Sequence, residues 1–145
     1  MIINMDLTIK IKNTILNIRV AVLIKGTKGY LFEKSKNGYI FCVGGRIKVN
    51  ESSLDAAKRE VEEELSFKVD KLTLKGIVEN FYKNTEGNVH EMCFVYEAEE
   101  VFSDIVQTEF VEVSVSDIDN FDVRPKVMAE FIEDEGGDFK HVIAK

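Results

Sequence analysis

The chain of 145 residues is poor in the residues that cross-link or interrupt a fold, with two cysteines and one proline. Cys42 and Cys93 lie in separate apolar runs, without a CxxC motif or a multi-cysteine framework. We therefore expect both thiols to be free and buried, in a reducing compartment. No stretch approaches the ~20 apolar residues of a membrane span, and the N-terminus lacks the apolar core of a signal peptide. These absences favour a cytoplasmic protein.

Basic residues are scarce relative to acidic ones: 19 Lys and Arg stand against 26 Asp and Glu, for a net charge of −7. An acidic surface repels polyanions, so general binding to nucleic acid or to an anionic membrane is not expected. An anionic substrate would have to be held locally, by metal ions and a few basic side chains. Since no linker, repeat or low-complexity tract interrupts the chain, we expect a single domain over residues 1–145.

Apolar or alternating runs rich in Ile, Val, Phe and Tyr predict strands along most of the chain. The predicted strands are Asp6–Ile11, Ile15–Ile24, Tyr30–Glu33, Tyr39–Val43, Leu72–Tyr82, Glu91–Ala98, Glu109–Ser114 and a short Phe139–Ile143. Two helices are predicted, over Ser52–Leu65 and from Arg124 or Pro125 to Asp134. Strands before, between and after two helices predict the α/β class, as an α/β/α sandwich with a mixed sheet between helices.

Both predicted helices carry an apolar stripe at helical spacing. The stripe of the first consists of Leu54, Ala57, Val61 and Leu65, and that of the second consists of Val127, Met128, Phe131 and Ile132. Ser52 and Asp55 at the start of the first helix form a variant of the capping box.

Three glutamates on the first predicted helix indicate chemistry. Glu60, Glu63 and Glu64 stand at i, i+3 and i+4, a spacing that stacks their carboxylates on one helical face. Anions so close together should hold protons or take a cation between them. A hard divalent ion such as Mg²⁺ prefers oxygen ligands and commonly shares them with substrate phosphates. Glu62 points away from this face and is expected to be solvated.

The glutamates belong to a longer pattern, GRIKVNESSLDAAKREVEEELSF, which runs from Gly45 to Phe67. It resembles the signature box of the Nudix hydrolases (MutT-like), G-x5-E-x7-R-E-U-x-E-E-x-G-U, in which U is aliphatic or bulky and apolar. The chain departs from this box at Ser66, which stands in place of the second glycine. A left-handed conformation at that helix end costs a serine about 1 kcal/mol. No carboxylate of the box is lost.

The resemblance implies a metal-dependent hydrolase that cleaves the pyrophosphate bond of a nucleoside diphosphate linked to a moiety X. By the same resemblance, Mg²⁺ or Mn²⁺ would be held by Glu60, Glu63, Glu64 and the backbone carbonyl of Gly44. Arg59 would orient the neighbouring glutamates through charge-assisted hydrogen bonds, and Gly45 and Glu51 would shape the loop before the helix. The catalytic residues would be Arg59, Glu60, Glu63 and Glu64.

The general base and the substrate-binding residues are left open by the box. Glu64 is our first choice of base, and the further candidates are His90, Glu91, Glu97, Glu99 and Glu109. Arg19, Lys34 and Arg46 flank the strands that enter the box and could hold a phosphate. Phe81 and Tyr82 could stack on a base or ring. For substrate binding we select Arg19, Arg46, Phe81 and Glu91.

The alternatives to an enzyme are a catalytically silent Nudix-like domain that senses a nucleotide, and an acidic interaction domain whose box is a relic. Both should have lost box carboxylates, whereas this chain keeps them. The resemblance implies a small-molecule nucleoside diphosphate derivative as substrate, such as ADP-ribose or another nucleotide sugar, a nucleoside triphosphate or a dinucleoside polyphosphate; capped RNA is a further candidate. The acidic composition makes RNA the least favoured. A homodimer is compatible with the resemblance.

Overall fold

The computed structural model describes residues 5–103, 108–134 and 136–145. In chain order its elements are β1 (Thr8–Ile11), β2 (Thr14–Gly26), β3 (Tyr30–Lys34), β4 (Ile40–Arg46), α1 (Ser53–Leu65), β5 (Leu72–Asn84), β6 (Gly87–Phe102), β7 (Phe110–Val113), the 3-10 helix η1 (Val115–Asn120), α2 (Met128–Glu133) and β8 (Lys140–Ala144). Among the described residues, no helix is long and apolar enough to cross a membrane.

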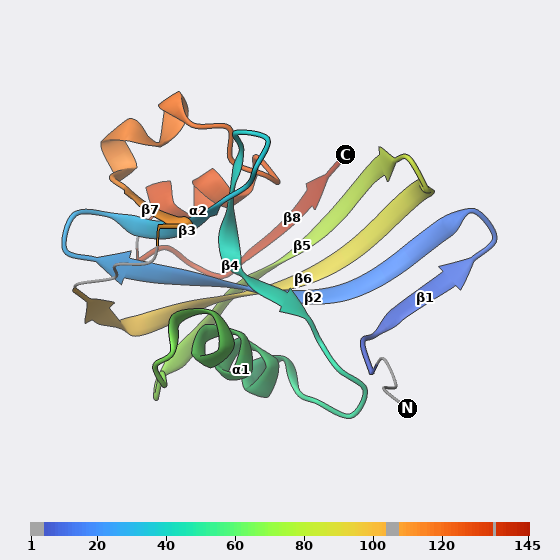
Figure 1. Ribbon diagram of the computed structural model, residues 1–145, viewed down its shortest axis with the longest axis horizontal. Coiled ribbons are helices and arrows are strands. Elements are labelled where there is room, and N and C mark those ends of the chain that lie inside the picture. Colours follow the sequence, from blue (N-terminus) through green and yellow to red (C-terminus); the bar gives the residue numbers. More distant parts are fainter. Residues whose placement is uncertain (1–4, 104–107, 135) are drawn as a thin grey trace.

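The strands form one mixed, eight-stranded sheet in the order β7-β3-β4-β2-β6-β5-β8, and β1 pairs with the start of β2. The long strand β2 lies parallel to β6, and β5 lies parallel to β8. The other pairings are antiparallel, including β2 with β4 and β5 with β6. Helix α1 covers one face of the sheet, while η1 and α2 cover the other (Figure 1). The predicted α/β/α sandwich with a mixed sheet is confirmed.

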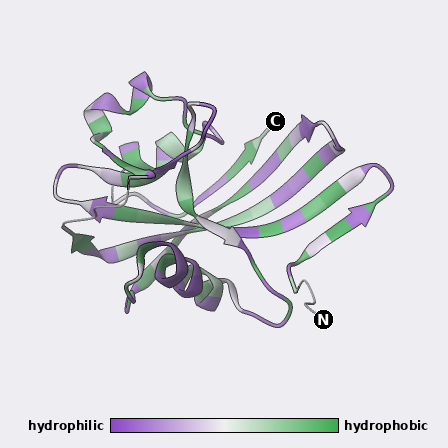
Figure 2. Ribbon diagram, in the orientation of Figure 1, coloured by the Kyte–Doolittle hydropathy of each residue, from purple (hydrophilic) through white to green (hydrophobic). Residues whose placement is uncertain are grey.

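Each face of the sheet has its own hydrophobic core because successive side chains of a strand point to opposite sides. Val20, Val22 and Ile24 of β2 belong to the core under α1. Ala21 and Leu23, which alternate with them, belong to the core under α2. The banding of polar and apolar residues along β1, β2, β5 and β6 is visible in Figure 2. This alternation decides which side chains of β2, β5 and β6 can meet at a site.

Helix α1 begins and ends as the sequence predicts. The hydroxyl of Ser52 accepts a hydrogen bond from the backbone N–H of Asp55 at 3.0 Å, which satisfies one free donor of the first turn. Ser66 closes the helix in the left-handed region, at φ 61°. The predicted apolar stripe is wrong at one position: Leu54 is 37% exposed, whereas Ala56 is fully buried. The small Ala56 and Ala57 lie on the sheet side of the helix, so α1 can pack closely.

The predicted second helix is too long. Only Met128–Glu133 is α-helical; Val123 forms a bridge with Ile40 of β4, Arg124 and Pro125 are bends, and Lys126 and Val127 form a turn that leads into the helix. The backbone N–H of Arg124 donates to the carbonyl of Ile40 at 2.9 Å, so this segment is tied to β4 before the helix begins. The sequence reading also missed η1. Of the predicted core residues, Met128, Phe131 and Ile132 are buried, and Val127 is only partly buried.

Candidate active site

The Gly44–Gly45 pair of β4 lies between two groups of polar side chains, one on each face of the sheet. An added Cβ at Gly45 would occupy the space of the Glu60 carboxylate on the α1 side. Gly44 lines a cavity on the α2 side, and a Cβ there would collide with the backbone carbonyl of Val20 in β2. A side chain at Gly44 would therefore have to displace the backbone of β2, whereas one at Gly45 would have to displace the flexible carboxylate of Glu60. The lack of room for a side chain at Gly44 is thus due to the neighbouring strand β2.

Arg59 ties helix α1 to the chain that precedes it. Its Nε and Nη2 donate to the two carboxylate oxygens of Glu51, at 2.7 and 2.9 Å. Nη2 also donates to the backbone carbonyl of Arg46, at 3.0 Å, while Nη1 donates to Glu60 at 2.8 Å and to Glu63 at 3.3 Å. These charge-assisted bonds lower the pKa of Glu51, and they fix the loop between β4 and α1.

The surroundings of Glu64 disfavour the ionised form of its carboxyl group. Its Oε2 is buried and has no hydrogen-bond partner among the described residues. Burial and the adjacent Glu33 and Glu60 carboxylates raise the pKa of Glu64 to about 8. Burial likewise raises the pKa of Glu60, although Arg59 acts in the opposite direction. An orphaned carboxylate oxygen facing other carboxylates fits a hard divalent cation.

The carboxylates are not yet gathered around a common point. In the described residues, no group of three or more His, Cys, Asp or Glu side chains is already arranged to hold a metal ion. Glu60 and Glu63 are bonded to Arg59 instead. Glu63 is 54% exposed and makes only the longer of these two bonds, so its side chain is free to turn.

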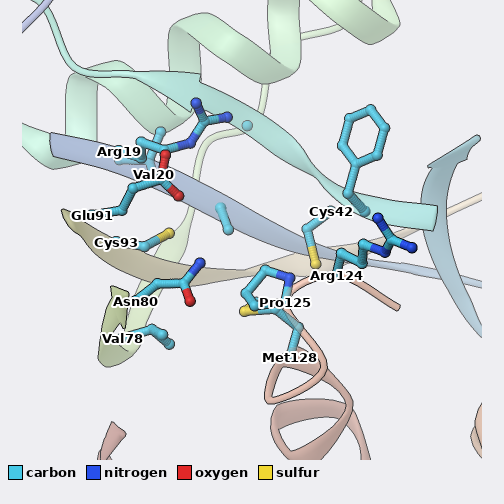
Figure 3. A pocket seen from close by; sticks show the side chains of 13 residues that line it. Arg19, Val20, Cys42, Val78, Asn80, Glu91, Cys93, Arg124, Pro125 and Met128 are labelled. Atoms are coloured by element: carbon cyan, nitrogen blue, oxygen red, sulfur yellow. The ribbon is translucent and has the colours of Figure 1, made fainter. Parts of the chain in front are cut away.

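The cavity on the α2 face is narrow, with a volume of about 70 Å³. It is lined by Arg19, Val20, Ala21, Phe41, Cys42, Gly44, Val78, Asn80, Glu91, Cys93, Arg124, Pro125 and Met128. Figure 3 shows Arg19, Asn80 and Glu91 on one side of it, and Pro125 and Met128 on the other. Arg19, Asn80 and Glu91 come from the neighbouring strands β2, β5 and β6, and Arg124 comes from the segment before α2.

Two of the predicted substrate-binding residues, Arg19 and Glu91, therefore share the cavity. The guanidinium of Arg19 forms no hydrogen bond or ion pair with a described residue. The carboxylate of Glu91 accepts a hydrogen bond from the Asn17 amide at 3.1 Å. Cys42 and Cys93 are free thiols, as predicted, and burial raises the pKa of Cys93 to about 12, so neither is poised for thiolate chemistry.

The other two predicted substrate-binding residues, Arg46 and Phe81, do not line the cavity. Arg46 is the register partner of Arg19 across β2 and β4, and its side chain lies 3.9 Å from the Asp6 carboxylate. Phe81 alternates with Asn80 along β5, so it lies on the opposite face from the cavity. Its ring packs against His90 with centroids 4.3 Å apart. Phe81 therefore does not line the cavity, and its position is explained by packing.

Tyr82 is on the cavity side of β5. Burial and the Glu91 carboxylate raise the pKa of Tyr82, while Arg19 and Arg46 act in the opposite direction. The phenol thus lies within the same group of charges as Glu91 and the two arginines. Of the residues that could stack on a ring, Tyr82 is better placed than Phe81.

The candidates for the general base are scattered. Glu91 lines the cavity. Glu109 lies near Glu33, whose pKa is raised first by burial and also by the charge of Glu109. Glu97 is held by Lys25 at 3.3 Å and by Lys75 at 3.9 Å, in a separate ion-pair cluster. His90 packs under Phe81 on the other face. Glu64 remains the candidate that lies within the carboxylate cluster.

The sequence reading missed Asn17, Glu33 and Asn80. Glu33 stands two residues after Leu31, a core residue under α1, so alternation places it on the α1 face. Asn17 is a polar residue inside an apolar strand, which is a signal that could have been used. Asn80 had no such signal, because only the strand register shows that it faces the cavity.

Comparison with known proteins identifies the family. The family model of the NUDIX domain matches residues 16–134, which is most of the chain. The chain belongs to the NUDIX family. As a Nudix hydrolase it is a member of a group of pyrophosphohydrolases that act on small nucleotide derivatives and generally use divalent metal ions. A sequence search of curated proteins finds no match.

Solved structures of Nudix hydrolases share the fold. The MutT protein of Bacillus halodurans is 19% identical with a TM-score of 0.67, over 80% of this chain and 81% of that one. The MutT protein of Methanosarcina mazei Go1 is 25% identical with a TM-score of 0.62, over 81% and 91%. The Ap4A hydrolase of C. elegans is 16% identical with a TM-score of 0.54, over 81% and 89%.

Proposed function

We propose that this Nudix hydrolase is a Mg²⁺- or Mn²⁺-dependent enzyme that cleaves the pyrophosphate of a nucleoside diphosphate derivative. The observation that carries the proposal is the buried, unpartnered Oε2 of Glu64 beside Glu33 and Glu60. A folded protein keeps such an oxygen where a proton or a cation satisfies it. Glu60, Glu63, Glu64 and the backbone carbonyl of Gly44 are the proposed ligands, with Glu33 adjacent to them.

When bound, the ion neutralises the bridging phosphates and polarises the attacking water. Water adds to one phosphorus, the bridging P–O bond breaks, and two phosphorylated fragments leave. Glu64, once ionised, is the proposed acceptor of the proton that this water loses. Arg59 holds Glu60 and anchors the helix, so its proposed role is to position the carboxylates rather than to touch the substrate.

The proposed site has two halves, on opposite faces of β4 at Gly44 and Gly45. Gly45 abuts Glu60 on one face, and Gly44 lines the cavity on the other, so the two glycines leave no side chain in between. Arg19 and Arg46, which are register partners on β2 and β4, are the proposed phosphate-binding residues on the cavity side. The base of the nucleoside would then reach the cavity with one edge.

The experiment is to incubate a panel of nucleoside diphosphate derivatives with Mg²⁺ or Mn²⁺ and to analyse the products. The panel includes nucleotide sugars, ADP-ribose, nucleoside triphosphates and dinucleoside polyphosphates. We expect cleavage of at least one member by the wild-type protein and a loss of about 100-fold or more in Glu63→Gln and Glu64→Gln. If no member is cleaved above these variants, the enzyme proposal fails and a nucleotide-sensing role becomes the better account.

A further inference from the structure

The cavity carries three polar side chains whose hydrogen-bonding capacity is not used up within the protein. Arg19 can only donate, Glu91 when ionised can only accept, and the Asn80 amide can do both. The side chains of Arg19 and Asn80 form no hydrogen bond with a described residue. The small volume of about 70 Å³ makes the cavity a slot that can take one edge of a flat ring rather than enclose a whole nucleoside.

Glu91 differs from the other two because a buried residue holds it. Asn17 is the one buried polar or charged residue in the described parts of the chain, with 4% of its surface exposed. Its Nδ2 donates to Glu91 Oε2 at 3.1 Å, and its Oδ1 accepts from the Thr8 hydroxyl at 2.9 Å. A carboxylate cannot donate, so the amide nitrogen of Asn17 must face Glu91. These two bonds fix the orientation of the amide.

A buried amide is costly to keep in an apolar strand unless its hydrogen bonds are made. A valine or leucine at position 17 would serve β2 equally well as packing. Asn17 instead links Thr8 of β1 to the Glu91 carboxylate through its two hydrogen bonds. Besides accepting from Asn17, the carboxylate of Glu91 lines the cavity beside the Tyr82 phenol, which lies within hydrogen-bonding reach of it.

We propose that Glu91, held in place by Asn17, is the residue that selects the nucleobase, and that it favours guanine. This inference rests on the proposed function for the presence of a nucleotide. A carboxylate accepts two hydrogen bonds best from two neighbouring N–H groups, and among the unmodified bases guanine presents such a pair, at N1 and N2. The adjacent O6 is an acceptor that suits the amide donor of Asn80.

The other bases do not present two adjacent N–H donors to the Glu91 carboxylate. Adenine and cytosine place a ring nitrogen acceptor beside their amino group, so one carboxylate oxygen would face a lone pair. Uracil offers one N–H between two carbonyl acceptors.

The test measures binding and hydrolysis separately. Binding of the nucleoside monophosphates of guanine, adenine, cytosine and uracil is measured by calorimetry without metal, because these are products whatever X is. Hydrolysis is measured on the four nucleoside triphosphates and on their diphosphate sugars. We expect guanine to be preferred by about 10- to 100-fold in binding and in KM. Cleavage of several bases at equal KM, with equal binding, would overturn this inference and leave the proposed hydrolase intact.

Glu91→Gln replaces one acceptor oxygen with a donor and keeps the shape of the side chain. We expect it to abolish the guanine preference by raising KM for guanine nucleotides, while kcat changes little. Glu86→Gln makes the same change of charge in the exposed β5–β6 turn and should leave selectivity unchanged. A guanine preference that survives Glu91→Gln contradicts the assignment. Absence of any cleavage by the wild-type protein would count against the proposed function, and the binding series would still test Glu91.

Asn17 is a positioning residue, so its variants are judged by selectivity rather than by activity alone. Asn17→Asp replaces the donor with an acceptor facing Glu91, and we expect the guanine preference to fall at least 5-fold. If that variant does not fold, Thr8→Val removes the hydroxyl that orients the amide and should weaken the preference in the same direction. A lower melting temperature with unchanged selectivity in the folded variants would show that Asn17 serves stability only.

Discussion

At the scale of single residues, Glu64 has the most consequential surroundings. Its carboxylate is half-buried, and the first cause of its raised pKa is burial, followed by the charges of Glu33 and Glu60. Arg59, the nearest strong cation, bonds Glu51, Glu60 and Glu63, and its bonds do not extend to Glu64. The protein therefore concentrates negative charge at one point and leaves that point without a cation of its own.

This arrangement sets the pH dependence of the metal-free protein. The pKa of Glu64 is about 8 in the folded state, whereas an unfolded glutamic acid ionises near its ordinary value of 4.5. Between these values the folded state binds the additional proton, so the free energy of unfolding falls as pH rises through this window. We expect the melting temperature without metal to decrease from about pH 5 to pH 8, and Mg²⁺ to restore it at pH 8.

Glu64→Gln removes the ionisation without removing the side chain. In the metal-free state we expect this variant to be at least as stable as the wild type at pH 8, with a flatter pH profile of melting temperature. Glu62→Gln, an exposed neighbour with the same change of charge, should keep the wild-type profile. A large drop in the melting temperature of metal-free Glu64→Gln would show that the carboxylate serves the fold.

At the scale of elements, helix α1 carries the proposed metal ligands, and Arg59 fixes its position. Lysine cannot reproduce the two bonds to Glu51 together with the bonds to Glu60 and to the Arg46 carbonyl. We expect Arg59→Lys to lower the free energy of unfolding by about 1–3 kcal/mol in chemical denaturation. Arg124→Lys, at an exposed pair with Asp122 and over the Tyr39 ring at 4.4 Å, is the comparison and should cost clearly less. Equal effects of the two changes would refute the anchoring role.

The end of α1 offers a second test at this scale. Ser66 has φ 61°, a conformation that costs a serine energy and that glycine adopts freely. We expect Ser66→Gly to raise the free energy of unfolding by up to about 1 kcal/mol and to leave activity unchanged. Ser114→Gly is the comparison, because Ser114 has φ −70° and gains nothing from glycine. A less stable Ser66→Gly protein would contradict this account of the helix end.

The sequence predicts elements well where local signals are strong. The Ser52 cap, the left-handed Ser66 and the span of α1 follow from local chemistry, and the structure confirms them. The prediction that Leu54 is buried is wrong because the face of α1 that packs on the sheet contains Ala56 and Ala57 instead. The start of α2 was misplaced because the bridge from Ile40 to Val123 is a long-range contact that no local pattern shows.

At the scale of the whole molecule, the sheet separates the candidate site into two halves. The box predicts the half on the α1 face, since its residues are close in sequence. The half on the α2 face joins Arg19, Asn80 and Glu91, which come from three strands. Register decides that Asn80 faces the cavity while Phe81 faces away, and a shift of one residue would exchange them. This is why the sequence selected Phe81 and missed Asn80.

The central claim is that the carboxylates of α1 hold a divalent cation beside Gly44 and Gly45. Titration of the protein with Mn²⁺, followed by the electron paramagnetic resonance signal of the free ion, measures this directly. We expect the wild type to bind Mn²⁺, Glu62→Gln to bind it equally, and Glu64→Gln to bind it at least 10-fold more weakly. Equal Mn²⁺ affinity in the wild type and Glu64→Gln, or no binding by the wild type, would contradict the account.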